Sequence, residues 1–321
     1  MVLEKNFRKY SHVVVTGGAG FIGSHLCEEY LKQGAAVTAI DNLVTGSFKN
    51  IAKLEGTKGF RFIEHDISAS MPDVGEFDLM LHFACPASPV DFAKMPLEIL
   101  KVDSLGTFNS LDAATKAKAR YVLASTSEVY GDPLEHPQKE SYWGNVNSIG
   151  DRSCYDEAKR FAEATTVAYR RKLGTDSGMV RIFNTYGPRM RLNDGRVVPN
   201  FCGQALRGEA LTVYGDGQQT RSFCYVTDLV DGIIRYAATD RTEPVNLGNP
   251  KEFKIRDFAD FILKNIPQSN SKIESRPLLH LDDPKQRRPD ISRAKEWLGW
   301  EPRVSLEEGI KKTIEYFRTV L

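Results

Sequence analysis

A glycine-rich turn near the N-terminus constrains this chain more than any other feature. Gly17, Gly20 and Gly23 follow the β-branched segment 12–16 and precede a segment with helical spacing, 21–33. The first glycine permits a tight turn, the second lets backbone approach a pyrophosphate, and the third lets the helix pack on the strand. The helix N-terminus adds free N–H groups and a partial positive charge for the phosphates. The pattern predicts a strand–turn–helix unit that binds a dinucleotide, with a purely structural turn as the alternative.

An acid at the end of the next predicted strand indicates which dinucleotide is bound. Asp41 follows the segment 36–40, about 20 residues beyond the glycines. A carboxylate there accepts hydrogen bonds from ribose hydroxyls and repels a 2′-phosphate, so the sequence favours NAD over NADP. Asp66, after the predicted strand 60–63, is either an adenine contact or an ordinary strand-end acid. The further predicted cofactor contacts are Phe21, Ile22, Asn42, Asp66, Ile67 and Lys159.

Alternating strand and helix patterns indicate the fold class. Predicted strands at 12–16, 36–40, 60–63, 77–83, 121–125 and 179–183 alternate with predicted helices at 21–33, 97–118 and 155–173. This order is typical of parallel strands with helices on both faces, and the nearly continuous apolar strands fit a doubly covered sheet. We expect an α/β protein, with a Rossmann-type doubly wound parallel sheet and a smaller C-terminal substrate-binding α/β domain.

The predicted domains are discontinuous in sequence. Residues 1–184, with a returning segment at about 225–248, form the NAD-binding Rossmann domain in this prediction. Residues 185–224 and 249–321 are loop-rich and contain amphipathic stretches, so they form the smaller domain. A cleft between the two is the expected ligand site.

Composition excludes several classes of function. Lys plus Arg is 43 and Asp plus Glu is 42, a balance that argues against a nucleic-acid or anionic-membrane partner. No apolar run reaches the roughly 18–20 residues of a membrane-spanning helix. Five cysteines lie far apart without a CxxC pair, which argues against a disulfide scaffold or a metal site. Scattered thiols and the lack of a signal-peptide pattern predict a cytoplasmic protein.

A tyrosine and a lysine form the predicted proton-transfer pair. Tyr155 and Lys159 are four residues apart in a predicted helix and therefore share a face. Free tyrosine titrates near 10, and a neighbouring ammonium favours the phenolate. Such a base suits a sugar hydroxyl that loses hydride to a cofactor. A tyrosine packed on a lysine stem is the ordinary alternative, but the dinucleotide turn favours the catalytic interpretation.

Polar residues at the end of the predicted strand 121–125 supply further candidates. Thr126 is placed to hydrogen-bond the substrate oxygen that the tyrosine deprotonates. Glu128 lies where catalytic residues of open α/β sheets collect. Burial is expected to raise the pKa of Glu128 and let it carry a proton. Without further evidence, an acid that caps a loop is the better interpretation of Glu128.

Several motifs resemble one enzyme family. TGGAGFIG, Asp41 and YDEAK resemble the extended short-chain dehydrogenases/reductases, which act on nucleotide sugars. Longer motifs are similar to the UDP-glucuronate decarboxylase (UDP-xylose synthase) branch, from about residue 12 to the end. They include HFACPASP, ASTSEVYGDPLEHPQ, YWGNVNSIGDRSCYDEAKR, RIFNTYGPRMRLNDGRVVPNF, YGDGQQTRSFCYVTDLV, DDPKQRRPDI and LGWEP. The resemblance implies a carboxy-lyase that holds NAD and converts UDP-glucuronate to UDP-xylose through a UDP-4-keto intermediate.

The resemblance also implies a role for individual residues. Tyr155 is the base and Lys159 its partner, Thr126 orients the reacting oxygen, and Glu128 assists decarboxylation and reprotonation. Arg287 engages the substrate carboxylate, for which guanidinium is a two-pronged donor, although Arg288 is an equal candidate from sequence. The implied substrate-binding residues are Ser127, Asn184, Arg191 and Arg221. The alternatives are turn capping for the asparagine and solvated surface charge for the arginines.

Four positions depart from the family pattern. Asp103 stands where asparagine is usual, Ser148 and Asp151 replace prolines, and Ala158 replaces a glycine beside Lys159. These changes predict a looser loop over the cofactor and release of some UDP-4-keto-pentose.

Alternative functions on the same fold remain open. A UDP-hexuronate 4-epimerase is the second candidate, although such epimerases usually carry a small residue in place of Glu128. A non-catalytic NAD-binding scaffold is the third, although it would typically lack Tyr155 or Lys159. Ser127 in place of an aspartate argues against sugar 4,6-dehydration. The predicted helices 97–118 and 153–173 resemble the family's homodimer surface, but from sequence they fit sheet-covering helices equally well.

Overall fold

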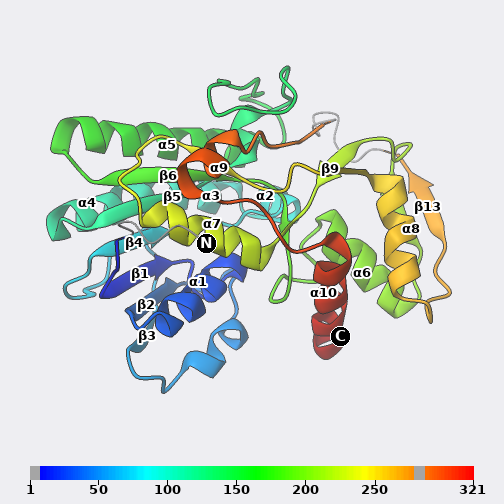
Figure 1. Cartoon of the computed structure of the whole chain (residues 1–321), viewed down its shortest axis with the longest axis horizontal. Helices are drawn as coiled ribbons and strands as arrows, with labels where there is room; N and C mark the ends of the chain where they lie inside the picture. The colour runs from blue at the N-terminus through cyan, green and yellow to red at the C-terminus, as the bar shows by residue number, and fades with distance from the viewer. Residues whose placement is uncertain (1–7, 278–285) are drawn as a thin grey trace.

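A seven-stranded parallel sheet forms the centre of the computed structural model, which describes residues 8–277 and 286–321 (Figure 1). The strand order is β11-β6-β5-β4-β1-β2-β3, and each neighbouring pair runs parallel. The strands are β1 (His12–Thr16), β2 (Ala36–Asp41), β3 (Phe60–Glu64), β4 (Leu79–His82), β5 (Arg120–Thr126), β6 (Ser177–Ile182) and β11 (Val245–Leu247). The predicted Rossmann-type sheet is confirmed.

Side chains alternate between the two faces of the sheet, as the pleat requires. Val13 and Val15 pack with Leu26 and Ile233, which lie on α1 (Phe21–Lys32) and α7 (Val226–Ala237). Val14, between them, packs on the opposite face. That face is covered by α4 (Thr107–Ala117) and α5 (Ser153–Leu173). Helices on both faces bury the sheet and leave its strand ends as the place for a ligand.

The order of the strands fixes where a ligand can bind. The chain moves outward from β1 through β2 to β3, and then returns to the other side of β1 with β4. The loops that follow β1 and β4 therefore diverge at their carboxyl ends and leave a crevice. The glycine-rich turn follows β1, and the Thr126–Glu128 segment follows β5, so both face this crevice.

The predicted helix 97–118 is interrupted by a wider turn. It consists of α3 (Pro96–Lys101), a π-helical turn η3 (Val102–Gly106) and α4. A π turn inserts one extra residue and re-aims the side chains around it, and such turns are frequent at functional sites. Asp103 lies in this turn and is fully buried. The hydrophobic spacing that predicts a helix contains no signal for this irregularity.

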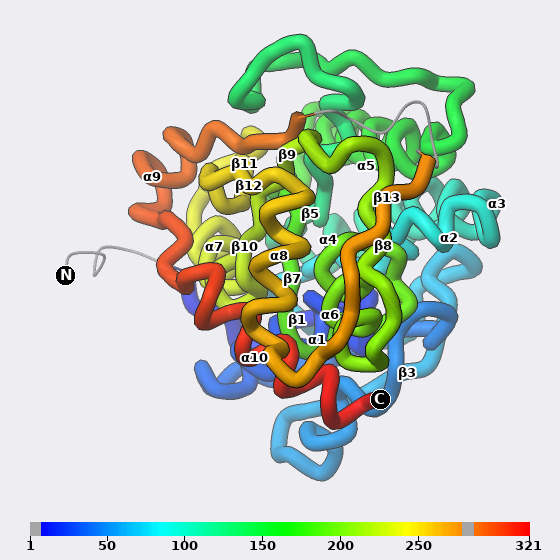
Figure 2. Tube along the Cα trace, turned by 90° about the vertical axis from the view of Figure 1, so that its right-hand side faces the viewer, coloured from blue at the N-terminus to red at the C-terminus, as the bar shows by residue number. Residues whose placement is uncertain are grey.

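The C-terminal elements gather beside the sheet and form a second unit (Figures 1 and 2). Helix α10 contacts α6 and α8, and β8 pairs with β13. Its helices are α6 (Val197–Arg207), α8 (Ile255–Asn265) and α10 (Leu306–Val320). Helix α9 (Ser292–Leu298) instead packs against β11 and α7, on the sheet. The short strand pairs are β7 (Thr185–Tyr186) with β10 (Cys224–Tyr225), β8 (Leu211–Tyr214) with β13 (Ile273–Arg276), and β9 (Thr220–Ser222) with β12 (Glu252–Lys254).

Between these units the chain crosses more than once. After α7 it returns to the sheet as β11, which pairs with β6. The remaining short helical elements are α2 (Pro89–Lys94), η1 (Phe48–Asn50), η2 (Ala52–Leu54) and η4 (Ser127–Tyr130). Within the described ranges, no helix is both long and apolar enough to cross a bilayer.

A close backbone approach inside the glycine turn gives a direct test. A Cβ on Gly23 would lie 2.1 Å from the carbonyl oxygen of Gly17, and neither backbone can yield. Gly23→Ala is therefore expected to lower the free energy of unfolding by about 1–3 kcal/mol and to weaken dinucleotide binding. Urea unfolding and calorimetric titration measure both effects.

Gly203→Ala is the matched control, because its added Cβ would meet the flexible end of Arg207 at 3.2 Å. That variant is expected to stay within about 1 kcal/mol of the wild type. A Gly23→Ala protein with wild-type stability and dinucleotide affinity would refute the packing argument.

Candidate active site

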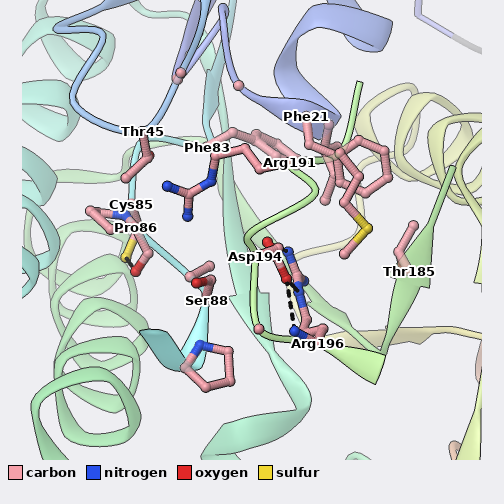
Figure 3. A pocket seen from close by; sticks show the side chains of 18 of the residues that line it. Phe21, Thr45, Phe83, Cys85, Pro86, Ser88, Thr185, Arg191, Asp194 and Arg196 are labelled. Carbon is pink, nitrogen blue, oxygen red and sulfur yellow. Dashed lines mark hydrogen bonds and ion pairs between the residues drawn. The ribbon is translucent and has the colours of Figure 1, made fainter. Parts of the chain in front are cut away.

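A cavity of about 1230 Å³ opens at the carboxyl edge of the sheet (Figure 3). Each residue predicted above for cofactor, substrate or catalysis lines it, while Arg288 does not belong to the lining. The volume exceeds the range of about 300–1,000 Å³ that is usual for one ligand. The site therefore has room for two ligands side by side, such as a dinucleotide and a nucleotide sugar.

The glycine turn presents backbone to one end of the cavity. Gly17 has φ +71°, a left-handed conformation that favours glycine. Gly20 is the N-cap of α1, and no side chain caps the helix there. The first turn of the helix also carries no acid, so Phe21 and Ile22 present N–H groups to the cavity without competition. This backbone cradle fits the pyrophosphate of NAD.

Asp41 is fixed beside the turn by two backbone donors. Its carboxylate accepts hydrogen bonds from Ala19 N at 3.0 Å and from Leu43 N at 2.9 Å. Burial raises the pKa of Asp41, and these N–H groups partly oppose that shift. A Cβ on Gly46 would lie 2.7 Å from the carboxylate, so the loop packs tightly on it. The carboxylate is thus held at the cavity wall, as the adenosine ribose of NAD requires.

The adenine end of the predicted cofactor site is also assembled. Asn42, Asp66 and Ile67 line the same part of the cavity as Asp41. The Asp66 carboxylate accepts from Ser68 N at 2.8 Å and from Ser68 Oγ at 2.7 Å. Burial acts to raise the pKa of Asp66, but these hydrogen bonds outweigh it and lower the pKa.

Tyr155 and Lys159 lie together on the cavity face of α5. Both side chains are buried, and the Lys159 ammonium lies 5.8 Å from the centre of the Tyr155 ring. Phe92 stacks on the tyrosine at 4.9 Å between ring centres. Burial raises the pKa of Tyr155 above its ordinary value, although Lys159 and a hydrogen bond with Thr126 act to lower it. The ammonium acts in the expected direction, but it does not produce a lowered pKa in the protein alone.

A buried acid that sequence reasoning treated only as a departure contacts the lysine. Lys159 Nζ donates to Asp103 Oδ1 at 2.8 Å. The other oxygen of Asp103 accepts from the Cys85 thiol at 3.0 Å. The ammonium is therefore shared between a carboxylate and the phenol rather than directed at the phenol alone.

Glu128 is held between two arginines. It lies in η4, and its backbone N–H donates to Thr126 Oγ1 at 3.2 Å. Its carboxylate accepts from Arg152 at 2.5 Å and pairs with Arg287 at 2.7 Å. Burial acts to raise the pKa of Glu128, but the two guanidinium groups outweigh it and lower the pKa to about 2. The expectation of a raised pKa is wrong for the protein alone, because sequence reasoning did not include Arg152.

The structure separates the two neighbouring arginines of QRRPD. Arg287 is buried and donates to Ser127 Oγ at 3.1 Å and to the Gly131 carbonyl at 3.0 Å. The Arg288 side chain is 42% exposed and lies 3.9 Å from Glu252. The geometry therefore places the first arginine, not the second, beside the reacting groups.

The far end of the cavity carries the predicted substrate residues. The Arg191 side chain points into the cavity and pairs with Asp91, while Arg196 pairs with Asp194 (Figure 3). Asn184 and Arg221 also line the cavity. Arg191 and Arg221, the two predicted substrate arginines, offer guanidinium donors to a diphosphate.

The other departures from the family pattern lie around α5. Ser148 and Asp151 are exposed in the segment that precedes the helix. Ala158 is buried in a small cluster with Phe92, Ile99 and Tyr155. None of the three lies among the residues that line the cavity.

Known proteins match this chain over nearly its whole length. The family model described as GDP-mannose 4,6 dehydratase matches residues 14–313. UDP-glucuronic acid decarboxylase 1 of Arabidopsis thaliana is 50% identical over 311 residues, which cover 97% of this chain and 71% of that protein. UDP-glucuronic acid decarboxylase 6 of the same plant is 51% identical over 318 residues, 98% of this chain and 91% of that protein.

A solved structure combines the same fold with both kinds of ligand. The UDP-glucuronic acid 4-epimerase from Bacillus cereus, in complex with UDP-glucuronic acid and NAD, superimposes with a TM-score of 0.86 at 28% identity. The match covers 97% of this chain and 100% of that one. That protein is in complex with two ligands, a nucleotide sugar and a dinucleotide, and the cavity here has room for two such ligands.

The charge state of Glu128 makes stability depend on pH. Its folded-state pKa lies below the unfolded value of about 4.3, so its contribution is present above that pH and is lost as the pH falls towards 2. Over this window the free energy of unfolding of the wild type should fall more steeply than that of Glu128→Gln, by up to about 1.4 kcal/mol per pH unit. Urea unfolding at several acidic pH values measures the slopes, and parallel slopes would contradict the assignment.

Proposed function

The chain belongs to the extended short-chain dehydrogenases/reductases that the GDP-mannose 4,6-dehydratase model describes, and we propose that it is an NAD-dependent UDP-glucuronate decarboxylase. The observation that carries this function is the identity of about half of all positions to curated UDP-glucuronic acid decarboxylases, across 97–98% of the chain. The cavity supports it, because one wall fits NAD and the other gathers a phenol, a carboxylate and arginines.

The first chemical step is oxidation at carbon 4 of the glucuronate. The glycine turn and Asp41 would hold NAD, which when bound would supply the hydride acceptor for carbon 4 and the hydride donor for the final reduction, so no second redox substrate would be needed. Tyr155, as phenolate, takes the proton of the carbon-4 hydroxyl. Thr126, at the end of β5, holds the same oxygen. Lys159 favours the phenolate and binds the cofactor ribose.

Decarboxylation follows from the position of the new ketone. The carbonyl at carbon 4 is β to the carboxylate on carbon 5, so the breaking carbon–carbon bond leaves its electron pair in an enolate and releases carbon dioxide. A proton then enters at carbon 5. Return of hydrogen to carbon 4, with the Tyr155 proton going to the oxygen, yields UDP-xylose. The net change is uptake of one proton and release of one carbon dioxide.

Arg287 and Glu128 act together on the acid group in this mechanism. Arg287 is the donor for the substrate carboxylate, and it is already paired with Glu128 in the protein alone. When the substrate carboxylate shares that guanidinium, Glu128 loses part of its stabilisation and its pKa rises. Glu128 then holds a proton that can move to carbon 5.

The two units of the fold divide the ligands. We assign NAD to residues 1–184 with 225–248, and the nucleotide sugar to 185–224 with 249–321. In this assignment the NAD contacts are the glycine turn, Asp41, Asn42, Asp66 and Ile67. The sugar nucleotide contacts Arg191 and Arg221 of the second unit, and also Ser127 and Asn184, which lie in the first unit at its border with the second.

Epimerisation is the second candidate, because a UDP-glucuronic acid 4-epimerase is among the structural relatives. In an epimerase the keto sugar must rotate so that its opposite face is reduced, and the sugar must keep its carboxylate. Sequence identity to the decarboxylases is about 50%, against 28% to that epimerase. The identity therefore favours decarboxylation.

Proton NMR of UDP-glucuronate with the NAD-loaded enzyme tests the function. A pentose product with release of carbon dioxide is expected. Formation of UDP-galacturonate would replace this proposal with the epimerase, and no change despite NAD binding would indicate a scaffold. The same spectra quantify UDP-4-keto-pentose, of which we expect some release because of the four departures at Asp103, Ser148, Asp151 and Ala158. Strict absence of the keto sugar at full NAD loading would contradict that release.

Removal of one phenolic oxygen tests the proposed base. Tyr155→Phe is expected to lower turnover by about 10²–10⁴-fold while binding of the sugar nucleotide persists. Tyr169→Phe is the matched control on the same helix, since its hydroxyl donates to Asp112 at 2.6 Å away from the cavity. Near-normal turnover in Tyr155→Phe would eliminate this residue as the base.

A homodimer is proposed from an apolar surface on the helices. Large apolar side chains on α3, η3, α4 and α5 are partly exposed, and Phe108 contacts Phe161 at 6.0 Å between ring centres. Exposed apolar patches of this kind mark protein interfaces, and a second copy is the usual partner. These residues are Leu97, Leu100, Leu105, Phe108 and Phe161.

A charge placed on this surface tests the dimer. Leu105 is 51% exposed, so Leu105→Arg should leave the fold intact and yield a monomer in light scattering after gel filtration. Leu134→Arg is the control, because Leu134 is 82% exposed in the loop that follows η4. A dimeric Leu105→Arg protein would exclude this surface.

We also propose that the protein acts in the cytoplasm. The support is chemical, since the five cysteines are free thiols and none forms a disulfide among the described residues. Recovery of the protein in a secreted or membrane fraction would contradict this assignment.

A further inference from the structure

The buried pair of Asp103 and Lys159 is the strongest electrostatic feature that the proposed chemistry leaves unexplained. Lys159 Nζ lies 2.8 Å from Asp103 Oδ1. Asp103 is 0% exposed and Lys159 is 3% exposed. An unpaired charge at such a depth costs several kcal/mol, so each group requires the other. The pair therefore fixes the ammonium at one place beside the tyrosine.

Asp103 is itself held from several directions. The Cys85 thiol donates to its second carboxylate oxygen at 3.0 Å. The Thr107 hydroxyl donates to its backbone carbonyl at 2.7 Å and lies 3.3 Å from His82 Nε2. The π-helical turn η3 provides the backbone shape that directs this carboxylate inward. Both carboxylate oxygens are thus engaged, and the negative charge has a defined position.

We propose that Asp103 is a positioning residue that sets how readily Tyr155 gives up its proton, by sharing the charge of Lys159. An ammonium that faces a phenol alone favours the phenolate, whereas a carboxylate at hydrogen-bond distance from that ammonium offsets part of its field. The same carboxylate also repels the phenolate directly. Asp103 therefore holds the tyrosine in its neutral form to higher pH than the lysine alone would allow.

The other groups around Tyr155 leave Asp103 as the decisive charge. From β4 and the segment after it, His82 and Cys85 face this region, and burial keeps both neutral near neutral pH: it lowers the pKa of His82 to about 3 and raises that of the thiol. From β5, Thr126 contributes a hydroxyl. From α2, Phe92 contributes an uncharged ring.

More distant charges are already paired. Arg196 interacts with Tyr155 and forms an ion pair with Asp194. Arg152, the N-cap residue of α5, pairs with Glu128. Replacement of Asp103 by a neutral residue therefore changes the balance beside the phenol by one full negative charge and leaves these pairs in place.

A spectroscopic titration tests the proposal in the NAD-bound full-length protein. The near-ultraviolet absorbance of tyrosinate is followed with pH for the wild type and for Asp103→Asn. In each background the same titration of the Tyr155→Phe counterpart is subtracted, so that only Tyr155 remains. We expect the midpoint of Tyr155 to fall by about one pH unit or more in Asp103→Asn.

Asparagine has the shape of aspartate and keeps an acceptor for the Lys159 ammonium, so the variant should fold. Asp103→Ser is the second neutral variant and should move the midpoint in the same direction. Asp176→Asn is the matched control: it removes a carboxylate from the buried Arg120 at the opposite edge of the sheet and should not move the midpoint. An unchanged Tyr155 midpoint in folded Asp103→Asn would overturn the proposal.

The catalytic consequence rests on the proposed function and is measured separately. If Tyr155 is the base for carbon 4, the alkaline-rising limb of kcat/KM with UDP-glucuronate should move to lower pH in Asp103→Asn by the same interval as the absorbance titration. A shifted midpoint in a protein that does not decarboxylate UDP-glucuronate would refute the proposed function and leave the role of Asp103 intact. A shifted pH–rate limb without a shifted Tyr155 midpoint would refute the role of Asp103.

Discussion

The close contact between the first and third glycines of the turn positions everything else in the site. With no Cβ at residue 23, the first turn of α1 packs on the carbonyl of Gly17 and its N-terminus is aimed at the cavity. The strand order then brings the ends of β4 and β5 opposite this helix end. Backbone donors thus occupy one wall and side chains from α5 the other. A dinucleotide whose pyrophosphate lies at the first wall would therefore extend its nicotinamide toward the second wall.

The charged groups of the site are satisfied in pairs within the protein. Glu128 pairs with two arginines, Lys159 pairs with Asp103, and Arg191 and Arg196 each pair with an aspartate. An anionic ligand must therefore compete with a resident carboxylate for each guanidinium. The resident ion pairs leave none of these charged groups unpaired when no ligand is bound. The same pairing gives selectivity. Only a ligand with anionic groups opposite the same arginines forms ion pairs that replace those of the displaced carboxylates.

The sequence predicts which residues form the site, but it does not predict how their charges affect one another. The sheet, the glycine turn and the positions of Tyr155 and Lys159 follow from local periodicity and spacing, and the structure agrees with them. The charge state of Glu128 depends on Arg152 and Arg287, which lie 24 and 159 positions away along the chain, and no local pattern records such a meeting. The π-helical turn at Asp103 was also missed, because apolar spacing survives one extra residue. Helix α6 was hidden by the proline in its first turn and the glycines before it.

The chain passes several times between the sheet and the second unit, and these connections limit the relative motion of the two units. The chain leaves the sheet after β6, returns through α7 and β11, and leaves once more towards β12. Because several segments connect the two units, the second unit cannot rotate about one connecting segment alone. Any widening of the cavity has to bend all of these connecting segments together. A ligand held between the two units can therefore leave through such a widening only when these connections move in concert.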